Sequence, residues 1–343
     1  MFFPSSSGPL ADRLQLGFAT AEDEQAPVLS VDGMTAVGPN LSHWPGNRTP
    51  PAWRADLSTG IALRFARAEH AEQRAFLGDV DRVVNDHYDT DGFGSLLAVL
   101  RPDVAFRRED TLLSAAAVGD FAVWHTWRGF AIDRIIKNLA APDSPVRGAF
   151  HGVEGDAALS LARYRWLLEH AESVLENTGG FRALYEEEMA QVDHELDQGL
   201  RGAVQVERLP EHGLAVVRSD GPRNRITLNT LAGAWRVLHA IGGRDGVRYR
   251  YHDRTESWFD LVTVQPHPRR DLRPLRDRLR LLEPERDGAS WHADPPETPI
   301  PELFFGPWSE QEYGEVTREL RPSSLKAERL RDELVRFFSR PET

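Results

Sequence analysis

The stretch VDRVVNDHYDTDGFGSLLAVL, residues 80–100, contains the strongest fold signal in the sequence. Its front half suits a short strand, the middle is a polar loop, and a helix begins at about Ser95. A strand, a polar loop and a helix in this order form the repeating unit of an open α/β sheet. The loop is therefore expected at the carboxyl end of a strand, where open α/β sheets bind their ligands.

The sequence predicts an N-terminal arm followed by two domains, and the stretch 80–100 lies in the first domain. Residues 1–27 are polar and turn-rich, and are expected to form a flexible arm. Residues 28–200 are predicted to form an open parallel-sheet α/β domain with a helical extension, whose first strand is Val28–Val31. Near residue 200 the sequence changes from mostly helical patterns to a mixture of strand and helix patterns. Residues 201–343 are therefore predicted to form a smaller α+β domain.

The second domain is expected to contain two pairs of strands and three helices, the last of them a short charged helix, SLKAERLRDELVRFF, at 324–338. Residues 203–219 read as a hairpin, and TLNTLAGAWRVLHAIGG at 227–243 reads as a helix with a glycine stop. GVRYRYHD at 246–253 and SWFDLVTVQ at 257–265 read as a second strand pair. An N-capped helix follows at 271–283.

The composition excludes several kinds of chemistry. The chain has 343 residues and no cysteine, which excludes disulfides, thiolate nucleophiles and cysteine-ligated metals. Only Lys137 and Lys326 among its 41 basic residues are lysines, so anion recognition must rest on arginine or on backbone N–H groups. The net charge of −12 argues against long nucleic acids and anionic membranes as partners.

No segment of the sequence reads as a targeting or membrane element. The N-terminus lacks a basic region followed by a long apolar region, and no apolar run approaches about 18 residues. The chain is therefore predicted to be cytoplasmic. The sequence leaves a homodimer open.

The polar loop in the middle of the stretch 80–100 is the main candidate site. Alternation along an extended segment places His87, Asp89 and Asp91 on one side, and Gly92 permits close approach of the backbone. Carboxylates with one imidazole suit Mn2+ or Mg2+. A calcium EF-hand is excluded, because its twelfth position would be Ala98 instead of glutamate. The alternative is an Asx-rich turn that only caps the following helix.

The pattern H-x-D-x-D-G-x-x-S is formed by His87, Asp89, Asp91, Gly92 and Ser95. It resembles the first motif of the DHH phosphoesterase superfamily. Members of that superfamily hold two Mn2+ ions in an α/β domain, and a smaller C-terminal domain binds the substrate. The superfamily's Asp-His-His triplet is absent from this sequence, which leaves a non-catalytic relative open.

The resemblance covers roughly residues 80–121 and implies roles for individual residues. His87, Asp89 and Asp91 would be metal ligands. Asp120 is placed like the superfamily's second aspartate motif and would be a further ligand. The resemblance also makes His87 and Asp120 candidate catalytic residues.

A long loop at residues 38–56 offers a further catalytic candidate, His43. If the strands at 28–31 and 82–85 are neighbours, His43 can face Asp89 and ligate a metal or act as acid or base. The alternative is a solvent-facing histidine in a loop anchored by a tryptophan. The whole layout, including the S-H-W-P-G-N segment in this loop, also resembles an uncharacterised bacterial family of unknown function.

Candidate substrate-binding residues lie in the second domain. Arg248 and Arg250 alternate on a predicted strand and can neutralise an anionic substrate, or they form a solvated outer face. Trp258 can stack on a base or pack inside the domain.

Three functions are consistent with these patterns. The first is a metal-dependent phosphoesterase-like hydrolase that acts on a small phosphate ester, a dinucleotide or a short oligonucleotide. The second is a non-catalytic relative that binds a nucleotide or phosphate. The third is a structural or interaction protein whose acidic loop caps a helix.

Overall fold

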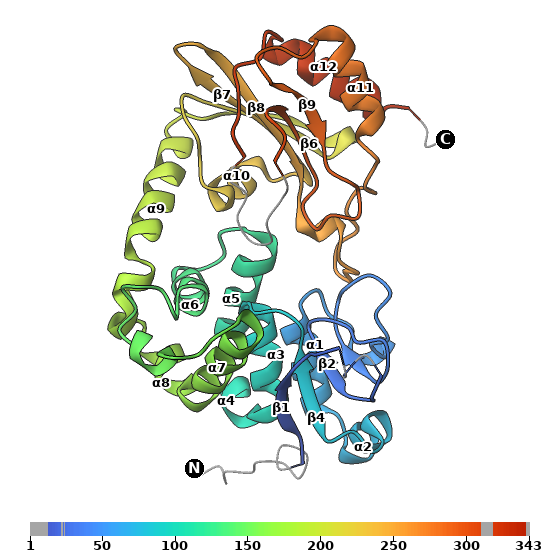
Figure 1. Cartoon of the computed structure of the whole chain (residues 1–343), viewed down its shortest axis with the longest axis vertical. Coiled ribbons are helices and arrows are strands. Elements are labelled where there is room, and N and C mark those ends of the chain that lie inside the picture. Colours follow the sequence, from blue (N-terminus) through green and yellow to red (C-terminus); the bar gives the residue numbers. More distant parts are fainter. Residues whose placement is uncertain (1–12, 22, 24, 310–317, 341–343) are drawn as a thin grey trace. The chain divides into compact units, whose positions relative to one another are not determined.

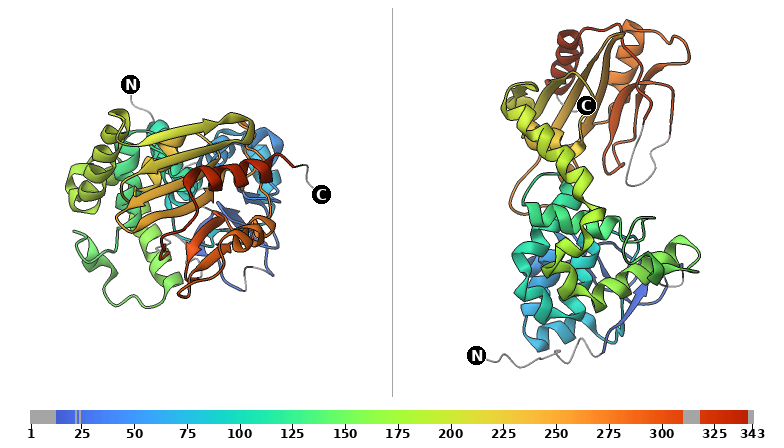
Figure 2. Two further views of the ribbon diagram at one scale, coloured as in Figure 1. Left: turned by 90° about the horizontal axis from the view of Figure 1, so that it is seen from above. Right: turned by 90° about the vertical axis from the view of Figure 1, so that its left-hand side faces the viewer.

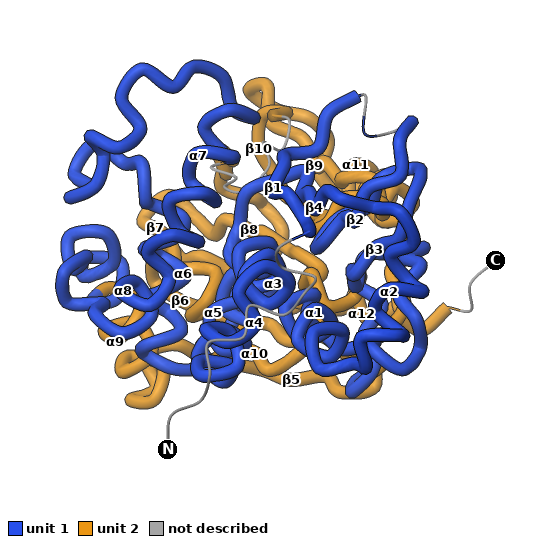
Figure 3. The backbone as a smooth tube through the Cα atoms, turned by 90° about the horizontal axis from the view of Figure 1, so that it is seen from below, with its two compact units in different colours: residues 1–190, 259–264 blue, residues 191–258, 265–343 orange. Residues whose placement is uncertain are grey.

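The computed structural model describes residues 13–21, 23, 25–309 and 318–340. These residues form two compact units, which Figure 3 distinguishes by colour. Unit 1 runs to Ala190 and also includes Phe259–Val264, and the rest of the chain forms unit 2. The chain passes from one unit to the other inside α9 (Glu186–Leu200), a helix visible in Figure 1, whereas the sequence predicts the boundary near residue 200.

Within the described residues, unit 1 contains a four-stranded sheet in the order β1-β4-β2-β3, in which all neighbours are parallel. Its strands are β1 (Gln15–Phe18), β2 (Leu29–Val31), β3 (Asn40–Leu41) and β4 (Arg82–Asn85). The two central strands, β4 and β2, have side chains such as Leu29, Val83 and Val84 that are buried on both faces of the sheet. Such strands read as continuous apolar runs, and the sequence identifies these two because the runs are short and lie between polar residues.

The strand β1 corrects the expected arm over residues 1–27. Its residues pair with β4 in parallel, from Gln15 opposite Arg82 to Phe18 opposite Asn85. Leu16 and Phe18 are half-buried against the unit 1 core. The expectation failed because four residues give too short a pattern to distinguish an edge strand from a polar arm. Residues 1–12 lie outside the described part of the chain.

Helices surround this sheet in unit 1, and α3 is the most deeply buried of them. The helices are α1 (Ser58–Arg67), α2 (His70–Leu77), α3 (Thr90–Leu100), α4 (Pro102–Arg107), α5 (Glu109–Phe121), α6 (Trp127–Lys137), α7 (Asp156–Glu169) and α8 (Ala171–Glu176). Glycines at the start of α3 permit close packing. A Cβ at Gly92 would lie 2.2 Å from the Asn85 side chain, and a Cβ at Gly94 would lie 2.1 Å from that of Thr59. The start of α3 is therefore held tightly against β4 and α1.

Unit 2 contains a six-stranded sheet, counted over the described residues, in the order β5-β6-β7-β8-β10-β9. Its strands are β5 (Gln205–Leu209), β6 (Leu214–Ser219), β7 (Arg236–Gly243), β8 (Gly246–Asp253), β9 (Ser290–Ala293) and β10 (Glu302–Gly306). β6 and β7 are parallel and the other neighbours are antiparallel, so the sheet is mixed.

Three helices pack on the two faces of this sheet: α10 (Arg225–Ala232), α11 (Arg273–Leu282) and α12 (Ala327–Phe338). Leu275 and Leu279 of α11 and Leu330 and Leu334 of α12 are buried in one core cluster with the side chains of one face. Figure 2 shows α12 lying across the strands. Residues of α10 belong to a separate core cluster with Val217 and Val237 on the opposite face.

Two predicted elements of unit 2 are wrong. The helix expected over 227–243 ends at Gly233, whose left-handed φ of 58° terminates α10, and the second half is the buried strand β7. The strand expected over 257–265 does not form, and β8 pairs with β7 and β10 instead. A strand that is buried on both faces lacks alternation, so its sequence is not distinguishable from that of a buried helix.

The predicted fold class is confirmed. The protein is mixed α/β, with an N-terminal parallel sheet and its helices followed by a second, mixed sheet with helices. None of the helices in the described residues is long and apolar enough to cross a membrane.

Candidate metal centre

The candidate site of unit 1 lies at the carboxyl ends of three neighbouring parallel strands. Asp32 follows β2 directly, His43 follows β3, and His87 follows β4. Because parallel strands end at the same edge of a sheet, residues that are distant in sequence meet there. Asp120 reaches the same place from the last turn of α5.

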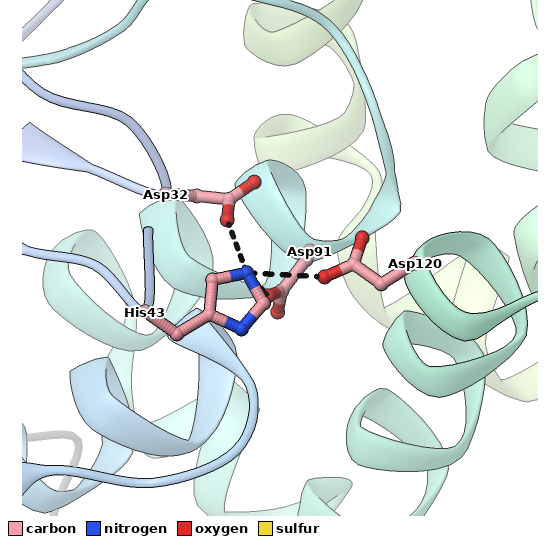
Figure 4. A group of neighbouring side chains, drawn as sticks. All are labelled: Asp32, His43, Asp91 and Asp120. Atoms are coloured by element: carbon pink, nitrogen blue, oxygen red, sulfur yellow. Dashed lines mark ion pairs between the residues drawn. The ribbon is translucent and has the colours of Figure 1, made fainter. Parts of the chain in front are cut away.

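Asp32, His43, Asp91 and Asp120 form one group of potential metal ligands (Figure 4). The Nε2 atom of His43 lies 3.6 Å from Asp32, 3.8 Å from Asp91 and 3.3 Å from Asp120. One ligand atom from each of the four residues lies within 4.8 Å of the others. The group could therefore hold a metal ion.

The protonation of His43 fits metal binding. Its Nδ1 atom lies 2.6 Å from the backbone oxygen of Asp56, which can only accept, so Nδ1 carries the proton. Burial lowers the pKa of His43, which keeps the ring neutral. Nε2 then presents a lone pair to three carboxylates, and among the described residues it makes no hydrogen bond. A lone pair facing carboxylates is repulsive unless a proton or a metal ion lies between them, and metal-bound histidines typically donate their other N–H to a carboxylate or a backbone carbonyl.

Asp32, His87 and Asp89 form a second group. The Nε2 atom of His87 lies 3.1 Å from Asp89 and 3.4 Å from Asp32. Its Nδ1 atom lies 2.6 Å from the carboxylate of Asp86, which orients the ring. Burial acts to lower the pKa of His87, but the three carboxylates around it raise that pKa well above its usual value.

Asp32 belongs to both groups. Its Oδ1 atom faces His43 and its Oδ2 atom faces His87. Burial, together with the charges of Asp89 and Asp91, raises the pKa of Asp32 well above its usual value. Burial and the charges of Asp91, Asp32 and Asp89 do the same to Asp120. Burial and mutual repulsion therefore disfavour the ionised forms of both carboxyl groups.

Two of the carboxylates also cap helices, which fixes their positions. Asp89 is the N-cap of α3 and accepts a hydrogen bond of 2.8 Å from the N–H of Gly92. Asp91 accepts hydrogen bonds of 2.7 Å from the N–H groups of Ser58 and Thr59 at the start of α1. The helix-capping role is thus real, and it leaves each carboxylate with further lone pairs for a cation.

The segment Phe259–Val264 packs on the first group. The ring of Phe259 stacks on His43 with a centroid distance of 3.8 Å. The carboxylate of Asp56 accepts hydrogen bonds from the backbone N–H groups of Val262 and Thr263. The segment therefore orients His43 through its ring and through the residue whose carbonyl binds Nδ1.

The structure brings together the residues predicted for unit 1. His43, Asp91 and Asp120 lie in the first group, and His87 and Asp89 lie in the second. Asp32, which joins the two groups, is missing from the sequence-based predictions. It follows the predicted strand over Val28–Val31 directly, so the position of a carboxylate at the end of a buried strand was an available signal.

The predicted substrate-binding residues all lie in unit 2. Arg250 faces the buried Glu302, with 3.7 Å between Nε and the carboxylate. Arg248 binds the exposed Asp245 at 2.6 Å. Trp258 is half-buried and follows a short 3-10 helix, not a strand as expected.

The fold and the site define an α/β protein with a buried aspartate–histidine group that could hold a metal ion. A model of a family of unknown function, DUF6687, matches residues 15–342, so the chain belongs to this family. The resemblance of the whole chain to an uncharacterised family is thereby confirmed, whereas the comparisons give no support for membership of the DHH superfamily. No curated protein and no solved structure matches the chain.

Proposed function

We propose that unit 1 holds a pair of divalent metal ions and that the protein is a metal-dependent, phosphoesterase-like hydrolase. The carboxylate of Asp32 carries this proposal, because its two oxygens face two different histidines at 3.6 and 3.4 Å. A carboxylate shared in this way is suited to bridge two ions. Each ion would have its own ligands besides the shared one: His43, Asp91 and Asp120 for the first, and His87 and Asp89 for the second.

The ligand chemistry favours Mn2+ or Mg2+. Carboxylate oxygens outnumber imidazole nitrogens in both groups, and cysteine is absent from the sequence. Such a pair would polarise a phosphoryl oxygen and lower the pKa of a bound water. The protein's own contribution is positional. Asp86 orients His87, the carbonyl of Asp56 orients His43, and the capped helix ends hold Asp89 and Asp91.

The proposed substrate is a small phosphate ester, a dinucleotide or a short oligonucleotide. The net charge of −12 disfavours a long polyanion, but a metal pair can hold a single phosphate group. The resemblance of residues 87–95 to the first DHH phosphoesterase motif supports a phosphate substrate. A non-catalytic relative that only binds such a ligand is the second candidate, since the Asp-His-His triplet is absent. A cytoplasmic location is part of the same proposal.

Metal analysis with a Mn2+ titration tests the proposal. The wild-type protein, stripped with a chelator and reloaded, is expected to bind two Mn2+ ions per chain, one for each group. Asp120→Asn should bind one, because Asp120 belongs only to the first group. The exposed Asp79→Asn is the matched control and should behave as wild type.

Hydrolysis of bis(p-nitrophenyl) phosphate separates the candidates. Activity that depends on Mn2+ and is lost in Asp120→Asn is the result expected for a hydrolase. Two bound ions without hydrolysis of this or other small phosphate esters would favour the non-catalytic relative. Absence of specific Mn2+ binding would contradict both and leave the helix-capping role.

A further inference from the structure

A tyrosine of α7 binds the main chain of the loop between β4 and α3. This loop contains His87 and Asp89, the two residues that belong only to the second group of potential ligands. The hydroxyl of Tyr164 donates a hydrogen bond of 2.9 Å to the backbone carbonyl of His87. The same hydroxyl accepts a hydrogen bond of 3.1 Å from the N–H of Asp89. One side chain from another helix therefore attaches the main chain of both ligand residues.

Tyr164 is itself held in one position. Its side chain is fully buried in the core cluster of unit 1. Burial raises the pKa of Tyr164 well above its usual value, so the hydroxyl keeps the proton that it donates to His87. The start of α3 leaves space for the hydroxyl, because a Cβ at Gly92 would lie 2.5 Å from its oxygen. The hydroxyl is thus a rigid anchor for the loop.

The residue between the two ligands gives the loop a second attachment. The hydroxyl of Tyr88 donates a hydrogen bond of 2.7 Å to the backbone carbonyl of Ile136 in α6. The guanidinium of Arg163, which precedes Tyr164 in α7, lies 4.8 Å from the centroid of the Tyr88 ring. The loop is therefore attached to two helices, while the side chains of His87 and Asp89 approach each other at 3.1 Å.

The second group depends on such an attachment more than the first group does. The side chains of His43 and Asp91, which belong only to the first group, are fully buried. Those of His87 and Asp89 are 16% and 33% exposed. Loops near solvent open easily unless their main chain is bonded to the core. The hydrogen bonds of Tyr164 supply that bonding at the second group.

We propose that Tyr164 is a positioning residue that holds His87 and Asp89 at the spacing required by the second metal ion. This inference rests on the proposed function, because it concerns the same pair of ions. Its hydroxyl acts through the main chain of the two ligand residues. Loss of a group that orients metal ligands typically weakens metal binding by about 10–100-fold.

The first ion should depend little on Tyr164, because its ligands have attachments of their own. Asp91 accepts hydrogen bonds from the N–H groups of Ser58 and Thr59. His43 is oriented by the backbone carbonyl of Asp56. Loss of the Tyr164 hydroxyl should therefore separate the affinities of the two ions.

Mn2+ titration of the full-length protein, after chelator treatment, tests the inference. Tyr164→Phe should bind the first ion as tightly as wild type and the second about 10–100-fold more weakly. Tyr249→Phe is the matched control, because this buried tyrosine of unit 2 also donates to a backbone carbonyl, that of Leu325, at 2.8 Å. Both variants should lower the melting temperature of the chelated protein, since each leaves a carbonyl without its donor. Only Tyr164→Phe should change Mn2+ binding.

The Asp120→Asn background identifies the ion that is affected. Asp120→Asn should keep only the second ion, so adding Tyr164→Phe should weaken the remaining site by about 10–100-fold. Equal Mn2+ affinities with and without Tyr164→Phe would overturn the inference and leave the proposed metal pair intact. A wild-type protein that binds no Mn2+ would overturn both.

Hydrogen exchange of the wild-type protein tests the inference without any variant, in case Tyr164→Phe does not fold. In the chelated protein, the amide proton of Asp89 should exchange at least about tenfold more slowly than in an unstructured peptide of the same sequence, because it is bonded to Tyr164. An Asp89 amide that exchanges as fast as in the peptide would show that Tyr164 does not hold the loop, and would overturn the inference.

Discussion

The two units bury opposite charges and compensate them differently. In unit 1, the carboxylates of Asp32, Asp91 and Asp120 surround the neutral His43. In unit 2, Arg318 is fully buried yet binds Asp294 and lies beside Glu302. Burying several carboxylates together is costly, and a bound cation would offset that cost in unit 1.

The difference teaches that the overall charge does not identify the ligands. A net charge of −12 suggests that anions are repelled everywhere. Locally, the carboxylates of unit 1 form a group that could hold a metal ion, whereas in unit 2 the guanidinium groups of Arg225, Arg250 and Arg318 lie 3.5, 3.7 and 3.2 Å from Glu302. Fields inside a partly buried cluster act over a few ångströms and outweigh the average charge, because water screens distant charges.

The substitution Asp32→Asn should have the largest effect, because Asp32 is shared by both groups. We expect loss of tight Mn2+ binding and a fall in metal-dependent hydrolysis of ~10³-fold or more. The chelated protein should become more stable than wild type, since one buried like charge is removed. Thermal unfolding with and without Mn2+ measures both effects.

The test is decisive because Asp32→Asn is expected to raise the stability of the chelated protein and to remove the stabilisation by Mn2+. Stabilisation without metal and lost stabilisation with metal indicate a charge cluster built for cations. An Asp32→Asn protein that is less stable in chelator and still gains stability with Mn2+ would contradict the comparison between the units. Asp79→Asn, an exposed substitution, is the control and should change neither quantity.

In unit 2 the corresponding substitution should destabilise the protein. Arg318→Met removes the partner of buried Asp294 and one partner of Glu302, which should cost about 3–5 kcal/mol of unfolding free energy. Urea unfolding measures this loss. Arg321→Met is the matched control, because Arg321 and its partner Glu319 are exposed, and it should cost less than about 1 kcal/mol. Equal effects of the two substitutions would show that unit 2 does not compensate its buried charges as described.

A pair of substitutions at Asp89 separates its capping role from its charge. Asn caps a helix about as well as Asp, so Asp89→Asn should keep the hydrogen bond from Gly92 and the stability of the chelated protein. Asp89→Ala should lose about 1 kcal/mol in chelator. Both should weaken Mn2+ binding, as measured by titration. If Asp89→Asn bound Mn2+ as tightly as the wild-type protein, the carboxylate of Asp89 would act only as a helix cap and not as a metal ligand.

The fold of unit 1 was predictable from the sequence because its signals are local. The stretch 80–100 contains a strand, a loop and a helix in direct succession, and the strand, although short, is a buried apolar run between polar residues. In unit 2, β7 is buried on both faces and follows α10 after a glycine, so the two elements read as one helix. β9 and β10 are short and lie in a proline-rich segment, and their pairing depends on contacts distant in sequence.

The site was predictable to the extent that its residues lie in one motif. His87, Asp89 and Asp91 are adjacent in sequence, and their alternation marks them. His43 was inferred from the expected order of the strands, and Asp120 from the resemblance to the second aspartate motif of the DHH superfamily. Asp32 carries no motif, and its role depends on β2 and β4 being neighbours, which is a property of the sheet. The position of Arg250 beside Glu302 likewise exists only once β8 and β10 pair.

The smallest predicted effect concerns Phe259, which lies between β8 and α11 in sequence but packs in unit 1. Its ring stacks on His43 with planes 20° apart, so Phe259→Leu should keep most of the burial but remove the stacking. Aromatic stacking contributes about 0.5–1.5 kcal/mol, so Mn2+ affinity should fall about two- to tenfold in a competition titration. Val262→Ala is the control, because the side chain is 48% exposed and the N–H that binds Asp56 is retained. Unchanged affinity in Phe259→Leu would mean that the Asp56 carbonyl alone orients His43, and the acidic cluster of unit 1 would then be independent of the segment that covers it.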